Sequence, residues 1–552
     1  MDAQNYSRRH SDLVRVGNII IGGDAPIRIQ SMNSTSTMDT LGSVEQAIRI
    51  ADAGGEIVRL TAQGVREAEN LGEIRAELRR RGYDVPLVAD IHFNPRAAFA
   101  AATKVEKVRI NPGNFADPGR TFKKLEYTDE EYAEELRRID DAVTPFLELC
   151  KENNTAIRIG VNHGSLSDRI MSRYGDTPSG MVESALEFLR ICKKRQFTDV
   201  VISIKASNTV VMVETVRRLV EAMDKEDMHF PLHLGVTEAG DGEDGRVKSA
   251  VGIGTLLMEG IGDTIRVSLS EEPELEIPVA RELVDYVTHR EHLPKVNKYI
   301  SKDYNRITPS ICPTVAAEGI GGDLPTAVIG VDFMPDSSVL TIDAADELDE
   351  AKVREHAPAP IMVTTSHPDK AASVLATLHR LRDIAPESPV AVSMDYEGED
   401  ADATTLHAAV DFGTLLMAGF CNAIGITNSR MNADELSHLA FTILQASRRR
   451  FTKTEYISCP SCGRTLFDLQ QTLHKIKAAT SHLPGLKIGV MGCIVNGPGE
   501  MADADYGYVG AAAGHVSLYR GKECITKNIP ADDAIDKLIE LLKSDGKWTD
   551  PC

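Results

Sequence analysis

Long apolar runs are absent from this chain of 552 residues. No stretch approaches the roughly 18 apolar residues of a membrane-spanning helix, and no apolar segment follows the basic pair Arg8 and Arg9 as it would in an export signal. We therefore expect a cytoplasmic protein that does not bind membranes.

Positive charge is scarce as well. The sequence holds 61 Lys and Arg residues against 82 Asp and Glu residues, which gives a formal net charge of −21. This balance argues against a nucleic-acid partner, and it means that an anionic ligand would need a local basic pocket.

A disulfide framework is not indicated either. The nine cysteines are an odd number and no export signal accompanies them, so we expect reduced thiols that are available for metal or redox chemistry. The content of 42% hydrophobic and 26% charged residues is typical of a globular protein, but the chain is too long for one hydrophobic core. We expect three domains, over residues 1–290, 291–450 and 451–552.

The N-terminal part alternates short β-branched runs with helical patterns. After the first run, Ser43 is the predicted N-cap of a helix, with Gln46 as its partner in a capping box. Eight such runs predict a parallel (β/α)8 barrel, the TIM-barrel fold. The runs are IRIQSM (27–32), EIVRLT (56–61), PLVADIH (86–92), KVRINPG (107–113), AIRIGVN (156–162), VVISIKAS (200–207), PLHLGVTE (231–238) and TIRVSLS (264–270).

Polar residues recur at or near the C-terminal ends of these runs, on the face where such barrels build active sites. Five of them are cations, and cations gathered at one mouth suit a polyanionic ligand, with diphosphate as the first interpretation. Alternatively, each cation pairs with an acid at the rim. The polar set comprises Arg59, Asp90, His92, Arg109, Asn111, Arg158, Asn162, Lys205, Glu238, Arg266 and Ser268.

Glu238, in the segment GVTEAG, has two interpretations. It could be a salt-bridge partner of Lys205 or Arg266, or a bound dianion could raise its pKa and make it a proton donor. We favour the catalytic interpretation.

The segment 291–450 contains a partial repeat of the end of the barrel. About five strand–helix units are recognisable, too few for a closed eight-stranded barrel. We therefore expect an incomplete, barrel-like α/β spacer, in which Gly425 stands where the barrel has Arg266, so that the phosphate-binding cation is lost. The paired segments are PLHLGVTEAGDGEDG with PVAVSMDYEGEDADA, from 231 and 389, and GTLLMEGIGDTIRVS with GTLLMAGFCNAIGIT, from 254 and 413.

Cys459 and Cys462, in CPSCGRT, are by themselves equally typical of a zinc knuckle. A zinc ribbon needs a second pair, but the sequence offers only Cys493, in MGCIVNGPGE, after a predicted helix and strand. A lone cysteine is most often a small buried hydrophobe, but the Gly-Pro-Gly turn that follows favours a metal ligand. That turn can bring Glu500 to the same metal, because its glycines allow unusual dihedral angles.

Three thiolates and one carboxylate are an unusual set for structural zinc. They suit a cubane iron–sulfur cluster with one distinct iron, because the weaker oxygen ligand would leave that iron exchangeable. We therefore expect a C-terminal α+β domain that binds such a cluster.

With these residues assembled, the chain resembles the 4-hydroxy-3-methylbut-2-enyl diphosphate synthase family, iron–sulfur enzymes of the non-mevalonate isoprenoid route. The insert resembles that of the long, three-domain variant. The motifs that carry the resemblance are QSM, LVADIHF, RINPGN, RIGVN, IKAS, LGVTEAG, GDTIRVSLS, CPSCGRT and GCIVNGPGE.

The resemblance implies reductive ring opening and dehydration of 2-C-methyl-D-erythritol 2,4-cyclodiphosphate by two electrons. It implies Glu238 as the proton donor, reduced flavodoxin or ferredoxin as the electron donor, and a homodimer. A [4Fe-4S] cluster would be held by Cys459, Cys462, Cys493 and Glu500. The substrate-binding residues would be Arg59, Asp90, Arg109, Asn111, Arg158, Asn162, Lys205, Arg266 and Ser268.

Two alternatives remain open. One is a phosphate-binding barrel with structural zinc, such as an aldolase or a pterin-handling transferase. The other is a non-catalytic iron–sulfur sensor, which would not need the barrel cations.

Overall fold

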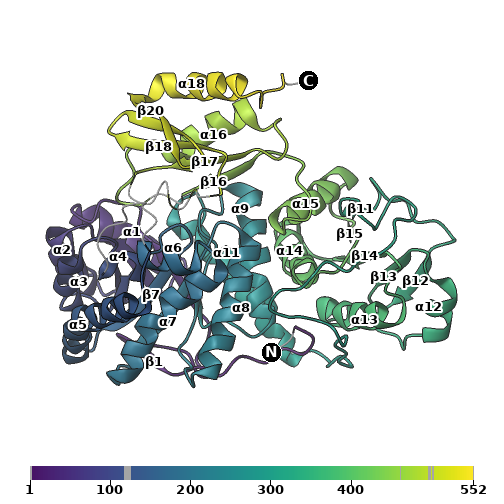
Figure 1. The fold of residues 1–552 in the computed structure, drawn as a ribbon, viewed down its shortest axis with the longest axis horizontal. Coiled ribbons are helices and arrows are strands. Elements are labelled where there is room, and N and C mark those ends of the chain that lie inside the picture. The colour runs from purple at the N-terminus through teal and green to yellow at the C-terminus, as the bar shows by residue number, and fades with distance from the viewer. Residues whose placement is uncertain are drawn as a thin grey trace. The chain divides into compact units, whose positions relative to one another are not determined.

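The computed structural model describes residues 3–116, 126–459, 462–494, 499, 501 and 503–550 (Figure 1). No helix in these ranges combines the length and the apolar character that crossing a membrane requires. The chain packs as two compact units. The first comprises residues 10–245, 262–280 and 453–552, and the second comprises residues 1–9, 246–261 and 281–452.

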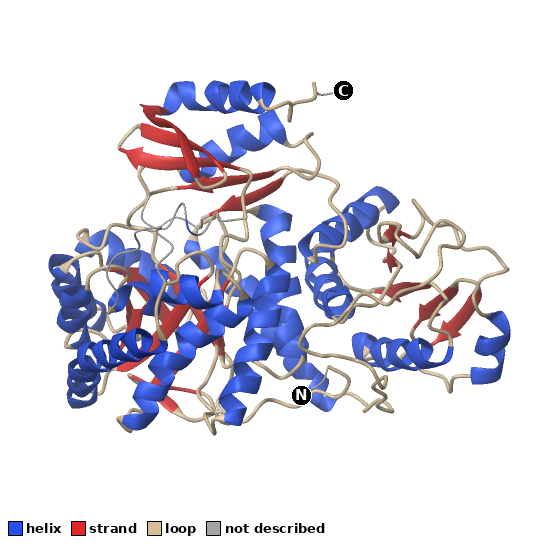
Figure 2. Cartoon of the chain, viewed as in Figure 1, coloured by secondary structure: helices blue, strands red, loops and turns tan. Residues whose placement is uncertain are grey.

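The first unit contains the predicted barrel, whose strands are drawn red in Figure 2. The eight strands are parallel in the order β8-β7-β6-β5-β4-β3-β10-β9, and a bridge between Ile202 and Leu232 joins the two ends of that order. Each predicted run contains one strand, so the barrel prediction is confirmed. The strands are β3 (Arg28–Met32), β4 (Ile57–Thr61), β5 (Leu87–Asp90), β6 (Lys107–Ile110), β7 (Ala156–Asn162), β8 (Val200–Lys205), β9 (His233–Leu234) and β10 (Thr264–Ile265).

Helices connect these strands, as the alternating pattern predicts. Between β9 and β10 two short helices flank a π-helical turn, Ala250–Gly254. The helices are α1 (Thr40–Asp52), α2 (Val65–Arg80), α3 (Pro95–Ala102), α4 (Pro112–Phe115), α5 (Asp129–Asn153), α6 (Asp168–Tyr174), α7 (Pro178–Lys194), α8 (Thr209–Lys225), α9 (Gly242–Ser249), α10 (Thr255–Met258) and α11 (Glu276–His289).

Helix α1 begins one turn earlier than predicted. Its N-cap is Asp39, whose side chain accepts a hydrogen bond from the backbone N–H of Gly42 at 3.0 Å. Ser43 and Gln46 therefore lie inside the helix, and the Gln46 side chain accepts a hydrogen bond from the backbone N–H of Ser34 at 2.7 Å. The capping-box prediction was wrong because an upstream carboxylate satisfies the helix start, which leaves Gln46 to hold the loop after β3.

A hairpin closes the N-terminal end of the barrel. Strands β1 (Val14–Val16) and β2 (Ile19–Ile21) are antiparallel. Their apolar side chains form one buried cluster with residues of four barrel strands, and we call this cluster the apolar plug. It contains Val14, Val16, Ile21, Ile57, Val88, Ala156 and Val201.

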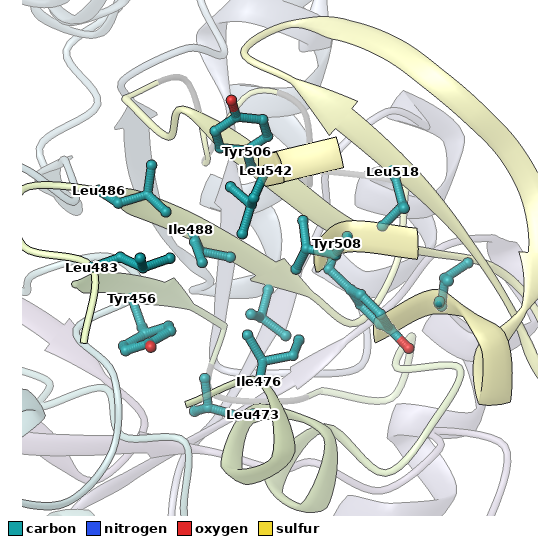
Figure 3. Close-up of a cluster of buried hydrophobic side chains, with 14 of the residues drawn as sticks. Tyr456, Leu473, Ile476, Leu483, Leu486, Ile488, Tyr506, Tyr508, Leu518 and Leu542 are labelled. Carbon is teal, nitrogen blue, oxygen red and sulfur yellow. The ribbon is translucent and has the colours of Figure 1, made fainter. Parts of the chain in front are cut away.

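The C-terminal part of the first unit is an α+β domain, as predicted. Its sheet has the order β16-β17-β18-β19-β20, with parallel pairing up to β18 and antiparallel pairing beyond. Helices α16 and α18 supply Leu473, Ile476 and Leu542 to one buried cluster on this sheet, shown in Figure 3. The elements are β16 (Glu455–Ser458), α16 (Leu469–Thr480), β17 (Lys487–Met491), β18 (Tyr506–Ala512), β19 (His515–Arg520), β20 (Glu523–Pro530) and α18 (Ala531–Ser544).

The second unit holds the insert, an open parallel sheet in the order β11-β15-β14-β13-β12. Five strands confirm the expectation of an incomplete barrel. An added Cβ at Gly425 would lie 3.0 Å from the Ile329 Cβ, so a larger residue has no room where the barrel carries Arg266. The elements are β11 (Ala327–Val328), β12 (Leu340–Asp343), α12 (Glu350–His356), β13 (Ile361–Thr364), α13 (Lys370–Ile384), β14 (Val390–Asp395), α14 (Ala401–Met417), β15 (Ala423–Thr427) and α15 (Ala433–Ala446).

The repeated segments adopt the same strand–helix–strand order, with parallel neighbouring strands in both copies. Their helical parts pack on one another through the two aligned glycines. An added Cβ at Gly254 would lie 2.7 Å from a Val410 methyl group, and one at Gly413 would lie 3.0 Å from the Val251 Cα. Each glycine therefore faces the residue three positions before the other, which is a pseudo-twofold contact.

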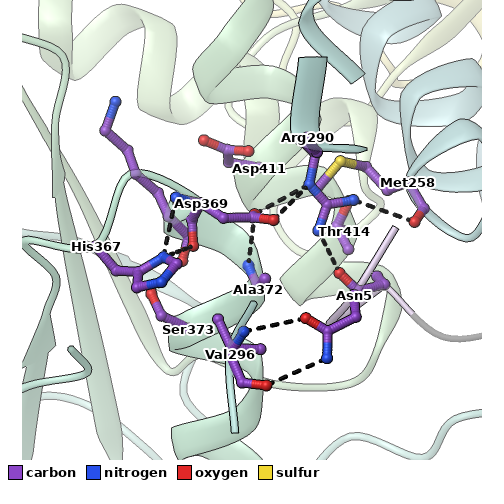
Figure 4. A network of polar contacts seen from close by, with 12 residues as sticks. Asn5, Met258, Arg290, Val296, His367, Asp369, Ala372, Ser373, Asp411 and Thr414 are labelled. Carbon is purple, nitrogen blue, oxygen red and sulfur yellow. Dashed lines mark hydrogen bonds and ion pairs between the residues drawn. The ribbon is translucent and has the colours of Figure 1, made fainter. Parts of the chain in front are cut away.

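Arg290 connects three segments of the second unit (Figure 4). Its guanidinium donates to both carboxylate oxygens of Asp369 at 3.0 Å, to the Met258 carbonyl at 3.3 Å and to the Ala3 carbonyl at 2.5 Å. Asp369 is also the N-cap of α13. This buried cation therefore fixes the N-terminal segment and the start of α13 on the helix before β10.

His407, on α14, lies between two carboxylates. Its ring nitrogens are 2.9 Å from Glu399 Oε2 and 2.9 Å from Glu282 Oε1, and the Tyr286 ring stacks on it with the ring centroids 3.8 Å apart. Burial lowers the pKa of His407, but the two carboxylates outweigh burial and raise that pKa above its ordinary value.

Candidate active site

One chamber lies between the barrel mouth and the C-terminal domain of the first unit, with an empty volume of about 740 Å³ that is partly open to solvent. Twelve of the fourteen predicted site residues line it. From the barrel these are Arg59, Asp90, Arg109, Arg158, Asn162, Lys205, Glu238, Arg266 and Ser268, and from the C-terminal domain Cys459, Cys462 and Cys493.

The other two predicted residues stand apart. Asn111 is the N-cap of α4, where its side chain accepts a hydrogen bond from the Gly113 backbone N–H at 3.0 Å, and it is not in the chamber lining. Glu500 lies outside the described residues.

Arg109 is held in place by four neighbours. Its guanidinium donates to Asp90 at 3.4 Å, to the Gly160 carbonyl at 2.9 Å and to Asn162 Oδ1 at 3.2 Å, and it lies 2.7 Å from His92 Nε2. Added bulk is excluded here, because a Cβ at Gly160 would lie 2.4 Å from Arg109 Nε. The cation at the end of β6 is therefore rigid.

Arg266 forms a buried ion pair that the sequence did not reveal. Its Nε and Nη2 donate to the carboxylate of Glu276 at 3.1 and 3.0 Å, and Ser31 Oγ donates to the same carboxylate at 2.6 Å. The side chains of Arg266 and Glu276 are 3% and 2% exposed. The charge of Arg266 is therefore balanced by the carboxylate of Glu276.

Three cations are different. Within the described ranges, Arg59, Arg158 and Lys205 have no ion pair with a carboxylate, although all three are buried. Burial lowers the pKa of Arg59 to about 10, and burial together with neighbouring arginines lowers the pKa of Lys205 well below its ordinary value. Buried cations that form no ion pair with a carboxylate favour a bound anion.

Asp90 and His92 sit beneath these cations. Burial raises the pKa of Asp90, but the charges of Arg59, His92 and Arg109 outweigh burial and hold that pKa well below its ordinary value. Burial and the Arg109 charge lower the pKa of His92 to about 4. Near neutral pH the carboxylate is therefore ionised and the imidazole neutral.

Glu238 has a strained backbone. Its φ of +53° lies in the left-handed region that non-glycine residues rarely adopt, and its side chain is buried at the chamber wall. The residue that follows it, Ala239, forms a parallel bridge with Ser458 at the end of β16. The loop that carries Glu238 is thus tied to the strand that precedes Cys459.

Further contacts hold the C-terminal domain on the barrel. Ser270 Oγ lies 2.8 Å from Ser458 Oγ and donates to the Cys459 carbonyl at 3.1 Å. The backbones of Gly164 and Gly499 also touch, because a Cβ added at Gly164 would lie 2.0 Å from the Gly499 carbonyl oxygen. Gly499 therefore lies against the loop that follows β7.

The three cysteine thiols are partly buried and have polar neighbours. Cys459 Sγ accepts a hydrogen bond from the Gly492 backbone N–H at 3.3 Å, and Cys462 Sγ accepts one from Arg464 Nε at 3.4 Å. N–H donors of this kind stabilise thiolates in iron–sulfur sites.

No group of three His, Cys, Asp or Glu side chains within the described ranges is close enough to hold a single metal ion. In a cubane cluster each thiolate binds a different iron, so the thiols lie farther apart than around one ion. The three thiols that line the chamber are of the donor type that such a cluster binds.

Arg464 is a site residue that sequence reasoning missed. It lines the chamber, and its guanidinium lies 3.8 Å from the Asp90 carboxylate. The signal was present, because the residue belongs to CPSCGRT, but its position opposite a barrel carboxylate depends on contact between distant segments. His92, one of the polar residues at the predicted strand ends, also lines the chamber.

Known families match both parts of the first unit. The GcpE TIM-barrel domain matches residues 11–281, and the GcpE protein C-terminal domain matches residues 455–544. The chain is 53% identical to the 4-hydroxy-3-methylbut-2-en-1-yl diphosphate synthase (flavodoxin) of Parabacteroides distasonis, over 99% of both chains. It is 41% identical to the protein of that name from Protochlamydia amoebophila, over 99% of this chain and 97% of the other.

Similar solved structures cover about half of this chain. The dihydropteroate synthase of Xanthomonas albilineans covers 51% of this chain and 100% of its own, with 14% identity and a TM-score of 0.33. A similarity this low has no bearing on function.

Proposed function

The chain belongs to the GcpE family, and from this premise we propose that it catalyses the reductive ring opening and dehydration of 2-C-methyl-D-erythritol 2,4-cyclodiphosphate to 4-hydroxy-3-methylbut-2-enyl diphosphate. Family membership confirms the resemblance carried by the motifs. One observation supports the assignment above all others. Buried cations from the barrel and three cysteines from the C-terminal domain line a single chamber.

The cations would bind the diphosphate in two ways. Arg59, Arg158 and Lys205 have no carboxylate partner in the described ranges, so they would neutralise the dianion. Arg109 and Arg266 are held by Asp90 and Glu276 and would present N–H donors in fixed directions. Asn162 and Ser268 line the same wall and would orient the substrate, whereas Asn111 would act indirectly through the start of α4.

The cysteine thiols fit an iron–sulfur cofactor. Cys459, Cys462 and Cys493, with Glu500, would hold a [4Fe-4S] cluster, which when bound supplies single electrons at low potential. The N–H groups of Gly492 and Arg464 that donate to two of the sulfurs would stabilise the charge on the thiolates.

Glu238 would hold the proton that the reaction consumes. The cyclic dianion, two electrons and one proton give the linear diphosphate trianion and water, so one acid is needed where the hydroxyl leaves. A dianion beside a buried carboxyl group favours its protonated form. The strained backbone of Glu238 fixes the side chain in the chamber wall.

The electron donor, the location and the assembly of the protein are further proposals. We propose reduced flavodoxin or ferredoxin as the electron donor, because the names of the similar proteins from Parabacteroides distasonis and Protochlamydia amoebophila include flavodoxin. We propose a cytoplasmic location, because thiolate ligands need a reducing compartment. A homodimer and the division into domains 1–290, 291–450 and 451–552 are also proposals.

The test begins with protein purified without oxygen. Iron and sulfide in near-equal amounts, and turnover of the cyclic diphosphate with a reduced donor, are expected. Cys493→Ala should lose iron and turnover, whereas Cys421→Ala, at a buried thiol of the insert, should lose neither. Arg158→Met should keep iron but lose turnover. Stoichiometric zinc with full activity would refute the cluster, and an Arg158→Met protein with full activity would refute the substrate site.

A further inference from the structure

A second polar layer lies inside the barrel beneath the chamber lining. It consists of Gln30 on β3, Lys107 on β6, Arg158 on β7 and His233 on β9, each at most 1% exposed. We call these four residues the inner layer. Lys107 pairs in register with Val88 and Ala156, both in the apolar plug, so the layer is closed below.

Several polar atoms of the inner layer have no hydrogen-bond partner in the described part of the chain. They are both side-chain amide atoms of Gln30, Lys107 Nζ, His233 Nε2, and Nε and Nη1 of Arg158. Buried polar atoms without a partner are rare in folded proteins, and a charged one is costly. Four residues of this kind inside one barrel call for a functional explanation.

The charges around Lys107 decide its protonation. The groups that act on it are Arg158 and Arg59, and those that act on His233 are Arg158, Lys205, Lys107 and Arg59. No carboxylate is among them. Burial and these two arginines lower the pKa of Lys107 well below its ordinary value. Since arginine holds its proton more tightly than lysine, Lys107 is the residue of this group that loses its proton.

Arg158 connects the inner layer with the substrate site. It lines the chamber above and is the cation that acts most strongly on Lys107 below. A dianion bound to Arg158 and Lys205 would offset the positive potential that, together with burial, keeps Lys107 neutral. A charged ammonium group would then be favoured in the same buried position.

We propose that Lys107 is a positioning residue that is neutral in the free protein and takes up one proton when the cyclic diphosphate binds. The inference rests on the proposed function for the identity of the ligand. Lys107 rather than His233 is the acceptor, because a lysine amine is more basic than imidazole by about 4 pH units and so charges first in the same surroundings. The ammonium group would then stabilise the bound dianion through Arg158 and the chamber floor.

The substrate itself does not obscure the measurement. Each phosphorus of a cyclic diphosphate carries one strongly acidic proton, which is lost well below neutral pH. Protons exchanged on binding near neutral pH therefore belong to the protein, either to Lys107 or to another group near the chamber such as Glu238 or His92.

The test is calorimetric titration of cluster-containing protein with the cyclic diphosphate, without reductant, in buffers of different ionisation enthalpy at one pH. Wild-type protein should take up about one proton, and Kd should rise about tenfold per pH unit while Lys107 is neutral when free. Lys107→Met should take up about one proton fewer and bind more weakly. Lys107→Arg, which is charged throughout, should bind without uptake at Lys107 and keep most of the affinity.

The control and the opposing outcomes are distinct. Lys151→Met removes an exposed lysine at the end of α5 and should leave the proton count unchanged. Binding without proton uptake in wild type, an unchanged count in Lys107→Met and Lys107→Arg, or a count abolished only by Glu238→Gln would overturn the proposal. Failure of wild-type protein to bind the cyclic diphosphate at all would instead overturn the proposed function.

Discussion

Replacing Glu276 with Gln should destabilise the barrel and make its stability depend on the substrate. Glu276 accepts two hydrogen bonds from Arg266 and one each from the Ser31 hydroxyl and the Leu269 backbone N–H, at 2.6 to 3.2 Å. The variant keeps the shape of the side chain but leaves the Arg266 charge, 3% exposed, without its counter-charge.

The expected loss follows from the burial of the pair. Removing one partner of a buried ion pair costs about 3–5 kcal/mol, because the remaining charge has been taken out of water. At about 2 °C for each kcal/mol in a domain of this size, the unfolding temperature should fall by about 6–10 °C. Substrate should stabilise the variant more than the wild type, because the bound dianion would supply the missing negative charge.

The assay is thermal unfolding followed by circular dichroism, with and without the cyclic diphosphate. Glu274→Gln is the matched control, since Glu274 pairs with Arg49 at 2.7 Å but with 22% and 49% of the two side chains exposed. Its cost should stay within about 1 kcal/mol. An E276Q protein that unfolds at the wild-type temperature, or whose substrate-induced shift is no larger than that of the wild type, would refute the reasoning.

Three further outcomes are expected. Gly164→Ala should lower iron content and turnover, because its Cβ would lie 2.0 Å from the Gly499 carbonyl oxygen. Gly175→Ala, also at positive φ but with its nearest contact at 3.4 Å, should cost about 1–3 kcal/mol of stability through backbone strain alone. His407→Gln should lower the unfolding temperature most at low pH. Because the pKa of His407 is raised in the folded state, its contribution to the free energy of unfolding is complete below about pH 6.5. That contribution is lost as the pH rises through the folded-state pKa. Arg464→Met should shift the cluster's midpoint potential to more negative values in a redox titration followed by electron paramagnetic resonance, because it removes a positive charge and an N–H donor to sulfur.

For each of these three predictions, one result would contradict it. Equal iron content in the two glycine variants would show that the contact with Gly499 does not matter. A destabilisation by H407Q that grows as pH rises would reverse the assigned direction of the pKa shift. An unchanged potential in R464M would remove Arg464 from the electrostatics of the cluster.

The barrel and its mouth could be read from the sequence because they follow from local patterns. Short β-branched runs such as VVISIK and the helical spacing between them depend on neighbours a few residues apart, and parallel strands place all their C-terminal ends on one face. The cations and cysteines could therefore be named before their positions were known. The predicted capping box at Ser43 and Gln46 was nevertheless wrong, because Asp39 is the N-cap of that helix.

Only the tertiary structure decided what each polar side chain faces. Arg266 meets Glu276, Arg464 lies beside Asp90, and Asn111 turns to cap α4 instead of lining the chamber. The same holds for Lys107, which has the spacing of an ordinary strand residue but whose charged neighbours in the described part of the chain are Arg158 and Arg59. Periodicity fixes which side of a strand a residue occupies, whereas the charge and solvation that set its chemistry come from segments hundreds of residues away, brought together by packing.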